Sequence, residues 1–191
     1  VNIMKKELTV ITGCDSGIGK ACAEFLMKHG REVAISYVEN NPFKSEPLCH
    51  AYRMDLRKEP DIERFAANIN KLCKQGYSVS CLFNNSGIAL GGPVENTPLA
   101  IYRQVFEINY FGHVSVIQKL IPLLKASRGT IMIHGSLAGK VALPFLAPYA
   151  SSKHAIEGFT DSLRRELKPF GIRTVLIESA AVATPICVKG K

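Results

Sequence analysis

The sequence predicts an α/β fold, in which a doubly wound parallel sheet carries helices on both faces. Six short runs of apolar and β-branched residues alternate with segments of helical periodicity along the 191 residues. The first run leads through a glycine-rich turn directly into a helix, as in a βαβ unit. No internal repeat or linker interrupts the alternation, so we expect one domain over residues 1–191.

The composition is typical of a soluble globular chain, with 47% hydrophobic and 21% charged residues. No run of 18 apolar residues and no signal-peptide pattern occurs, so we expect a cytoplasmic protein without a membrane segment. Six scattered cysteines without a C-x-x-C pair predict reduced thiols, not a disulfide framework or a metal site. The net charge of +8 suits an anionic ligand or a solvated basic surface, and no motif for nucleic-acid binding accompanies it.

The first strand is expected at residues 8–12, and the glycine-rich turn follows at residues 13–19. A helical pattern begins there and ends at Gly30. Such a turn lets backbone N–H groups approach a pyrophosphate at a helix N-terminus, where the helix dipole favours negative charge. A glycine-rich turn can also be mere punctuation, but its place between strand and helix favours nucleotide binding.

The second strand is expected at residues 32–36 and completes the βαβ unit. A dinucleotide-binding unit usually carries an acidic residue after this strand for the ribose hydroxyls. Tyr37 occupies that position here, and Val38 follows it. Residues 40–49 contain two prolines and no helical period, which predicts a loop.

The third strand is expected at residues 50–56, with Asp55 near its end. Asp55 could bond an exocyclic amine of adenine, or it could cap a turn. A helix should then run from Pro60, because proline is well tolerated in a first turn, to Gly76.

The fourth strand, at residues 78–83, delivers the sequence Asn-Asn-Ser-Gly of residues 84–87. Ligands of open α/β sheets bind outside the carboxyl ends of the strands, so this turn is a candidate for cofactor contact. A plain turn is the alternative. A long helix follows at residues 99–124, with Asn109 in its middle. Asparagine is a poor helix former, so Asn109 has either a specific role or a satisfied place in the core.

The fifth strand, at residues 130–134, brings Ser136 to the same edge of the sheet. The next helix opens near Tyr149 and ends at Pro169, and a last strand is expected at residues 173–178. Residues 179–185 then return to the ligand edge.

Tyr149 and Lys153 lie four residues apart in the first turn of that helix, so both side chains can enter one pocket. A free phenol has a pKa of about 10, and a neighbouring ammonium favours its phenolate form. The pair could therefore exchange a proton with an alcohol or a carbonyl. A solvated helix face is the alternative.

Together these motifs resemble the short-chain dehydrogenase/reductase family over residues 8–186. They are T-G-C-D-S-G-I-G at residues 12–19, N-N-S-G at 84–87, Asn109, Ser136 and Y-A-S-S-K at 149–153. The run at residues 155–172 resembles the retinol dehydrogenase and 17β-hydroxysteroid dehydrogenase-like branch. The resemblance implies a Rossmann-type NAD(P)-binding domain and an oxidoreductase that interconverts a small hydrophobic secondary alcohol and its ketone.

The resemblance also implies roles for the four catalytic positions. Tyr149 would be the general acid/base, and Lys153 would lower its proton affinity and hold the nicotinamide ribose. Ser136 would orient the substrate oxygen, and Asn109 would position a water that relays protons to Lys153.

The implied cofactor contacts come from the glycine turn, from the ends of the following strands and from the segment after the last strand. They are Gly13, Asp15, Ser16, Gly17, Ile18, Gly19, Tyr37, Asp55, Leu56, Asn85, Ser86, Gly87, Tyr149, Lys153, Val182 and Thr184. The basic residue that marks NADP use is absent, since positions 16 and 38 hold serine and valine. We therefore expect NAD in preference to NADP, although the positive overall charge favours NADP.

Some features depart from the family pattern. Ser179-Ala180 stands where Pro-Gly is usual, and the helix after the second strand is shortened or lost. Family members also continue past this point with a substrate-covering lid, a further helix and a last strand. A non-catalytic dinucleotide-binding sensor is therefore the alternative function. The resemblance further suggests a homodimer or homotetramer that assembles through helices 99–124 and 149–168.

Overall fold

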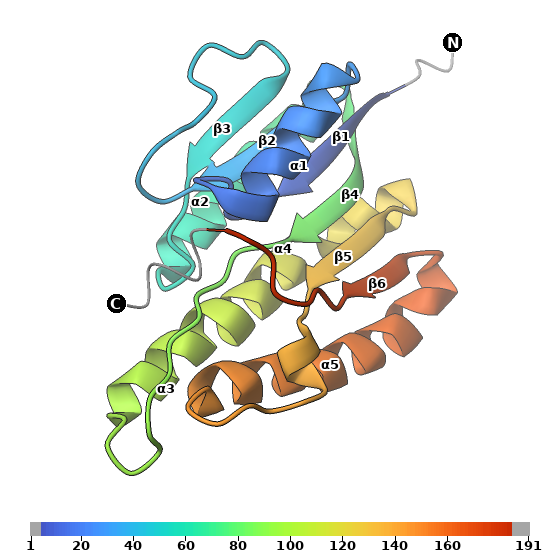
Figure 1. Ribbon diagram of the computed structural model, residues 1–191. Coiled ribbons are helices and arrows are strands. Elements are labelled where there is room, and N and C mark those ends of the chain that lie inside the picture. The colour runs from blue at the N-terminus through green and yellow to red at the C-terminus, as the bar shows by residue number, and fades with distance from the viewer. Residues whose placement is uncertain (1–4, 185–191) are drawn as a thin grey trace.

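Six parallel strands form one twisted sheet in the computed structural model, which describes residues 5–184 (Figure 1). The strand order is β3-β2-β1-β4-β5-β6, with crossover connections between them. The strands are β1 Lys6–Ile11, β2 Glu32–Tyr37, β3 Cys49–Arg53, β4 Tyr77–Asn84, β5 Thr130–His134 and β6 Arg173–Ile177. The predicted parallel α/β sheet is confirmed, and all six carboxyl ends meet at one edge.

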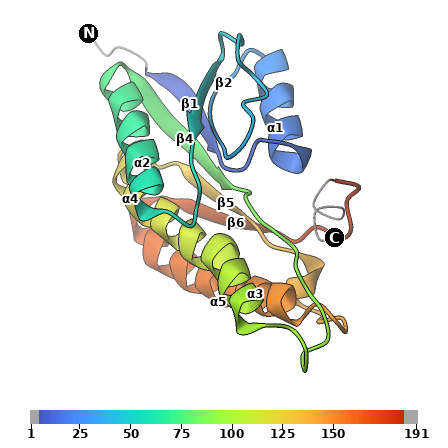
Figure 2. The ribbon, with the colours of Figure 1, turned by 90° about the vertical axis from the view of Figure 1, so that its left-hand side faces the viewer.

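Helices cover both faces of the sheet (Figure 2). One face packs against α2 Glu59–Lys74, α4 Gly112–Ser127 and α5 Ala147–Leu167, which bury aliphatic side chains such as Ile69, Leu120 and Ile156. The opposite face packs against α1 Gly17–Lys28 through Ala23 and Met27. The doubly wound arrangement expected from the alternating pattern is therefore present.

The long helix expected at residues 99–124 is not regular throughout. It consists of α3 Leu99–Phe106, a π-helical turn at Glu107–Phe111, and then α4. The apolar period continues across the break, so sequence periodicity alone does not reveal it. Asn109 lies inside the π-helical turn and is fully buried. A π-helical turn inside a helix is often found at a functional site.

The connection between β2 and β3 contains no helix, as its prolines predicted. Phe43 and Leu48 of this loop pack against the α1 side of the core instead. Strand β3 ends at Arg53, three residues before the predicted end at 56, so Asp55 and Leu56 lie beyond the strand.

Within residues 5–184 the cysteines are free thiols, and Cys187 lies outside the described residues. In the same range, no group of metal-ligating side chains occurs that could hold an ion. No helix of the described part is long and apolar enough to cross a membrane.

Candidate active site

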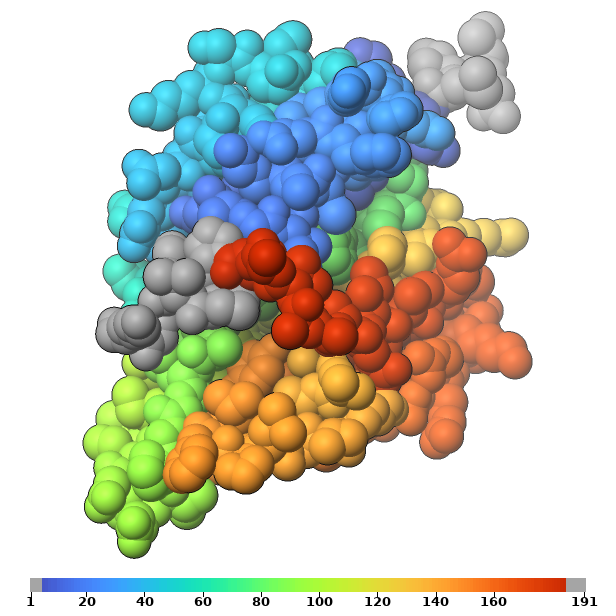
Figure 3. Space-filling model, viewed as in Figure 1, coloured from blue at the N-terminus to red at the C-terminus, as the bar shows by residue number. Residues whose placement is uncertain are grey.

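A cavity of about 1080 Å³ lies at the carboxyl edge of the sheet. Segments that follow all six strands line it, and the segment after β6 lies between the β1–α1 residues and those that precede α5 (red, blue and orange in Figure 3). Most residues that the motifs singled out reach this cavity: Gly13, Asp15, Ser16, Gly17, Ile18, Asp55, Leu56, Asn85, Ser86, Gly87, Ser136, Tyr149, Lys153, Val182 and Thr184. Gly19, Tyr37 and Asn109 do not line it.

The glycine turn brings backbone to the cavity wall. Gly13 and Gly17 have backbone φ angles of 70° and 61°, which residues with a side chain rarely adopt. A Cβ on Gly13 would lie 2.7 Å from Oγ of Ser86, so the turn has no space for a side chain there. Ser16 precedes α1 without capping it through its side chain, and the first turn of α1 has no acidic residue. The N-terminus of α1 at the cavity therefore fits an anionic group such as the pyrophosphate of a dinucleotide.

Asp15 fastens the glycine turn to the end of β2. Its carboxylate accepts backbone N–H groups from Val38 at 3.0 Å and from Glu39 at 2.9 Å. Ser36, Val38 and Glu39 line the cavity, whereas Tyr37 does not. Tyr37 lies beside these lining residues, and its contact with a cofactor stays a prediction.

Asp55 forms an ion pair with Arg57. Arg57 was not among the site residues predicted from the sequence. Arg57 donates from Nε to Oδ1 at 2.9 Å and from a terminal nitrogen to Oδ2 at 2.7 Å. The hydrogen bonds from Arg57 hold the pKa of Asp55 below its ordinary value. Both residues line the cavity, so the segment after β3 presents Asp55 there as an ion pair with Arg57.

Asn85 connects β4 to the glycine turn. Its Nδ2 donates to the backbone oxygens of Thr12 at 3.0 Å and Gly13 at 3.1 Å. Its backbone N–H donates to Oγ1 of Thr12 at 3.0 Å. A Cβ on Gly19 would lie 2.5 Å from Nδ2 of Asn85, so Gly19 serves close packing behind the cavity. These contacts fix the turn that faces the cavity.

Tyr149, Lys153 and Ser136 converge on the same cavity from α5 and from the end of β5. Lys153 is 4% exposed, and its Nζ lies 5.7 Å from the centroid of the Tyr149 ring. Burial lowers the pKa of Lys153 to about 8. Oγ of Ser136 accepts the N–H of Ala138 at 3.1 Å, which leaves its hydroxyl proton for another acceptor.

Asn109 lies behind the cavity. Its Oδ1 accepts the N–H of Ile88, and its Nδ2 donates to the oxygen of Ile88, both at 2.9 Å. The same Nδ2 is 3.1 Å from Oγ of Ser152, which in turn donates to the backbone oxygen of Tyr149. Asn109 thus ties the loop after β4 to the first turns of α5.

The sequence reasoning also missed His134, at the end of β5, and Ser36, at the end of β2, which both line the cavity. Their position at carboxyl ends of predicted strands was the available signal. Ser36 accepts the N–H of Gly13 through Oγ at 3.1 Å. It therefore holds the turn from the β2 side, as Asn85 does from the β4 side.

The sequence profile described as short chain dehydrogenase matches residues 7–190. The chain belongs to the short-chain dehydrogenase family. Membership makes it an enzyme that carries out NAD(P)-dependent oxidation or reduction, and the glycine turn and cavity fit such a dinucleotide.

Relatives of this short-chain dehydrogenase include the NADPH-dependent 3-dehydrocapnine reductase of Ornithobacterium rhinotracheale, which is 39% identical over 95% of the chain and 68% of the relative. The 11-beta-hydroxysteroid dehydrogenase type 2 of Oryctolagus cuniculus is 36% identical over 92% of the chain and 45% of the relative. The expected likeness to the hydroxysteroid dehydrogenase-like branch is thus confirmed. The chain spans about two thirds of the first relative's length and less than half of the second's.

A similar solved structure is the 3-ketoacyl-(acyl-carrier-protein) reductase of Brucella melitensis complexed with NADH. It has a TM-score of 0.86 and 27% identity, and the match covers 97% of this chain and 80% of that chain. The structural likeness supports the Rossmann-type fold.

Proposed function

We propose that this protein interconverts a secondary alcohol and a ketone, with Tyr149 as the general acid/base. The observation that carries the proposal is the buried ammonium of Lys153 beside the Tyr149 ring, with Ser136 on the same cavity. Tyr149 would give up its hydroxyl proton and take it back, with the ammonium of Lys153 as the nearby positive charge.

Bound NAD(P) supplies the hydride chemistry, and side chains of the protein transfer the proton to or from the substrate oxygen. Tyr149 donates its hydroxyl proton to a ketone oxygen, or its phenolate removes the proton of an alcohol. The Ser136 hydroxyl donates a hydrogen bond to the same substrate oxygen and orients it. Lys153 stabilises the phenolate, and Asn109 keeps the first turns of α5 in register with the loop at Ile88.

The rim of the cavity supports a hydrophobic substrate. Apolar side chains from the loop after β4 and from the segment before α5 line it: Ile88, Leu90, Ile108, Val141, Leu143, Phe145 and Leu146. Several of these side chains are more than half exposed; Leu143, for example, is 59% exposed and Phe145 is 64% exposed. A substrate that covers them gains stabilisation from the removal of apolar surface from water. We therefore propose a small hydrophobic alcohol or ketone as substrate.

The choice of cofactor depends on the corner at the end of β2. Ser16 and Val38 give no basic residue there, which is the basis for the expectation of NAD. Arg53 favours NADP, because its Nε donates to the backbone oxygen of Val38 at 3.0 Å and brings a guanidinium to this corner. The relative named NADPH-dependent also favours NADP. The ratio of kcat/KM for the two cofactors decides between them.

Turnover of a panel of hydrophobic alcohols and ketones, with NAD and NADP in both directions, tests the proposed reaction. We expect Tyr149→Phe to lower kcat by at least ~100-fold, because the proton carrier is removed. Tyr102→Phe is the matched control, since Tyr102 of α3 does not line the cavity. Equal turnover by wild type and Tyr149→Phe on every substrate would contradict the proposal.

The alternative is a non-catalytic sensor that binds a dinucleotide. The departure at Ser179-Ala180 motivates it, whereas the presence of Asn109, Ser136, Tyr149 and Lys153 argues for catalysis. Dinucleotide binding without turnover on the whole panel would support the sensor.

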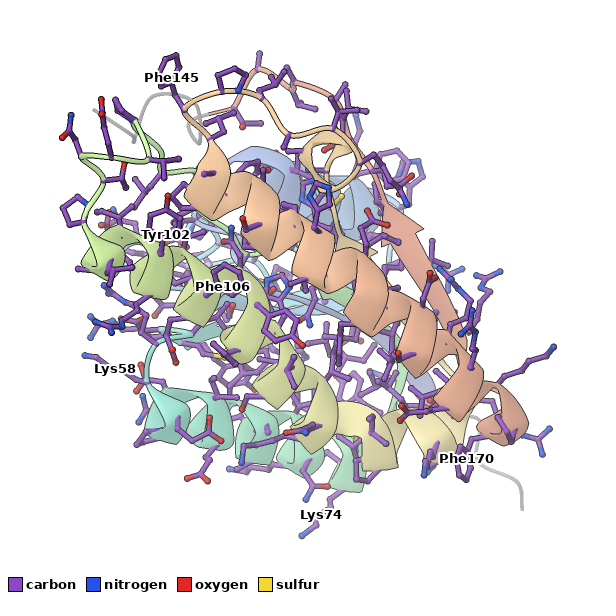
Figure 4. All side chains as sticks on the ribbon, turned by 90° about the horizontal axis from the view of Figure 1, so that it is seen from below. Lys58, Lys74, Tyr102, Phe106, Phe145 and Phe170 are labelled. Carbon is purple, nitrogen blue, oxygen red and sulfur yellow. The ribbon has the colours of Figure 1, made fainter. Side chains whose placement is uncertain are left out.

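We also propose a cytoplasmic homodimer or homotetramer that assembles through the outer helices. Figure 4 shows α3–α4 and α5 side by side, with Tyr102 and Phe106 on α3. Phe111, which follows in the π-helical turn, is 53% exposed. Light scattering during size exclusion measures the mass, and Phe111→Lys should lower it if this face joins two copies.

A further inference from the structure

His134 is the last residue of β5, the strand that lies between β4 and β6 in the sheet (Figure 1). Nδ1 is 3.2 Å from Oδ1 of Asn85, beyond β4. Nε2 is 2.9 Å from Oγ of Ser179, in the segment after β6. One side chain therefore connects Asn85, which holds the glycine turn, to the segment after β6.

The hydrogen-bond partners determine where the ring proton is. Asn85 uses both protons of Nδ2 on the backbone oxygens of Thr12 and Gly13, so its Oδ1 is an acceptor. Nδ1 of His134 must then carry the proton and donate it to Oδ1. Nε2 is consequently the acceptor, and the hydroxyl of Ser179 donates to it.

The ring remains neutral in this arrangement. Burial, followed by the charge of Lys153, lowers the pKa of His134 to about 4. A proton on Nε2 would reverse the bond to Ser179, whose hydroxyl would then accept instead of donate. Burial and the Lys153 charge thus favour the neutral ring, in which Ser179 is the donor.

His134 and Ser179 are also fixed through their backbones. The backbone oxygen of His134 accepts a hydrogen bond from Nζ of Lys153 at 2.7 Å. The backbone oxygen of Ser179 accepts the N–H of Leu137 at 3.0 Å, directly after Ser136. The segment after β6 is therefore joined to Lys153 through His134, and directly to Leu137, the residue after Ser136.

We propose that the His134–Ser179 pair is a positioning device that holds residues 179–184 in place for the nicotinamide end of the dinucleotide. In the usual Pro-Gly sequence, the proline ring restrains the backbone by fixing its φ angle. Here the hydrogen bond between His134 and Ser179 restrains the same position instead. The inference rests on the proposed function only in assigning the nicotinamide to this side of the cavity.

Dinucleotide binding, measured by fluorescence titration of the purified protein, tests the pair. Ser179→Ala should raise the Kd of the preferred cofactor by about 3- to 10-fold, the usual effect of one lost hydrogen bond. His134→Gln can still accept from Ser179, and His134→Asn can still donate to Asn85 but cannot reach Ser179. We therefore expect the Kd of His134→Gln to remain near that of wild type and the Kd of His134→Asn to rise as in Ser179→Ala.

The double variant His134→Asn with Ser179→Ala should bind no more weakly than either single variant, because both remove the same bond. Independent, additive losses, or an unchanged Kd in Ser179→Ala, would overturn the proposal.

The ring tautomer gives a test that needs neither cofactor nor turnover. Nitrogen-15 NMR of the free protein should show His134 protonated on Nδ1, and the Ser179→Ala variant should shift the Nε2 resonance. A proton on Nε2 at neutral pH would overturn the inference. If the Kd and NMR results hold while Tyr149→Phe leaves turnover unchanged, the proposed reaction fails and the pair stands.

Discussion

The ammonium of Lys153 donates to the backbone oxygen of His134 over 2.7 Å, and this bond joins the first turns of α5 to the carboxyl end of β5. Burial lowers the pKa of Lys153 to about 8. No described carboxylate forms an ion pair with it. The charge beside Tyr149 is therefore held by a neutral backbone group and is lost within a pH unit or two above neutrality.

The titration of Lys153 should appear in the pH dependence of stability. Because the pKa in the folded state lies below the unfolded value of about 10.4, the charged form disfavours folding, and stability rises as the pH passes from 8 to 10. Relative to Lys153→Met, the wild-type free energy of unfolding should rise by about 2 kcal/mol over that range. Denaturant unfolding at each pH measures it, with Lys20→Met on α1 as control. A constant difference between wild type and Lys153→Met would contradict the assignment.

Gly13→Ala should lose both stability and cofactor binding, whereas Gly30→Ala should lose only stability. The two glycines have φ angles of 70° and 72°, but a Cβ on Gly30 would have no heavy atom within 4 Å. We expect about 1 kcal/mol of destabilisation at Gly30 from the backbone alone and about 2–5 kcal/mol at Gly13, where Ser86 must also move. Urea unfolding and cofactor titration separate the two effects. Equal losses in both variants would show that the contact with Ser86 is unimportant.

Asn109→Ala should destabilise the protein by about 2–4 kcal/mol, because it leaves the N–H and oxygen of Ile88 without their partner. The lost link to Ser152 should also lower kcat, since the first turns of α5 carry Tyr149. Asn70→Ala is the control, an exposed asparagine of α2 whose loss should be within ~0.5 kcal/mol. Calorimetry and single-turnover kinetics measure the two effects. A kcat equal to that of wild type would limit Asn109 to a structural role.

Arg53→Ala should raise the KM for NADP by about 10-fold and leave the KM for NAD unchanged, if the guanidinium at Val38 meets the 2′-phosphate. Arg31→Ala removes the same charge at the other end of β2, where Arg31 pairs with Glu7, and controls for net charge. Initial rates with both cofactors provide the comparison. Equal changes in both KM values would exclude Arg53 from cofactor selection.

The sequence was sufficient to predict what depends on local pattern. The alternation of strands and helices, the glycine turn and the missing helix after β2 each follow from periodicity or from glycine and proline chemistry. The strand ends also predicted which edge carries the site. Asn85 and Ser136 therefore reach one cavity, although 51 positions separate them along the chain.

Pairings between distant side chains could not be predicted in this way. Arg57 donates hydrogen bonds to the carboxylate of Asp55, and three backbone N–H groups after β2 donate to the carboxylate of Asp15. The ring of His134 meets Ser179 only because β5 and β6 are neighbours in register. Such contacts depend on exact distances across the sheet, which composition and spacing do not contain.

The π-helical turn at Glu107–Phe111 has a consequence for insertions and deletions. A π-helical turn holds one residue more than an α-helical turn, and the wider turn absorbs that residue without turning α4 away from α3. Deletion of a single residue between 107 and 111 could therefore restore an α-helical turn and leave the two helices in nearly their present orientation. The effect of such a deletion should fall on the bonds between Asn109 and Ile88, and not on the close packing of Gly112 against Leu56. The flanking helices thus tolerate a change of chain length that the turn itself does not.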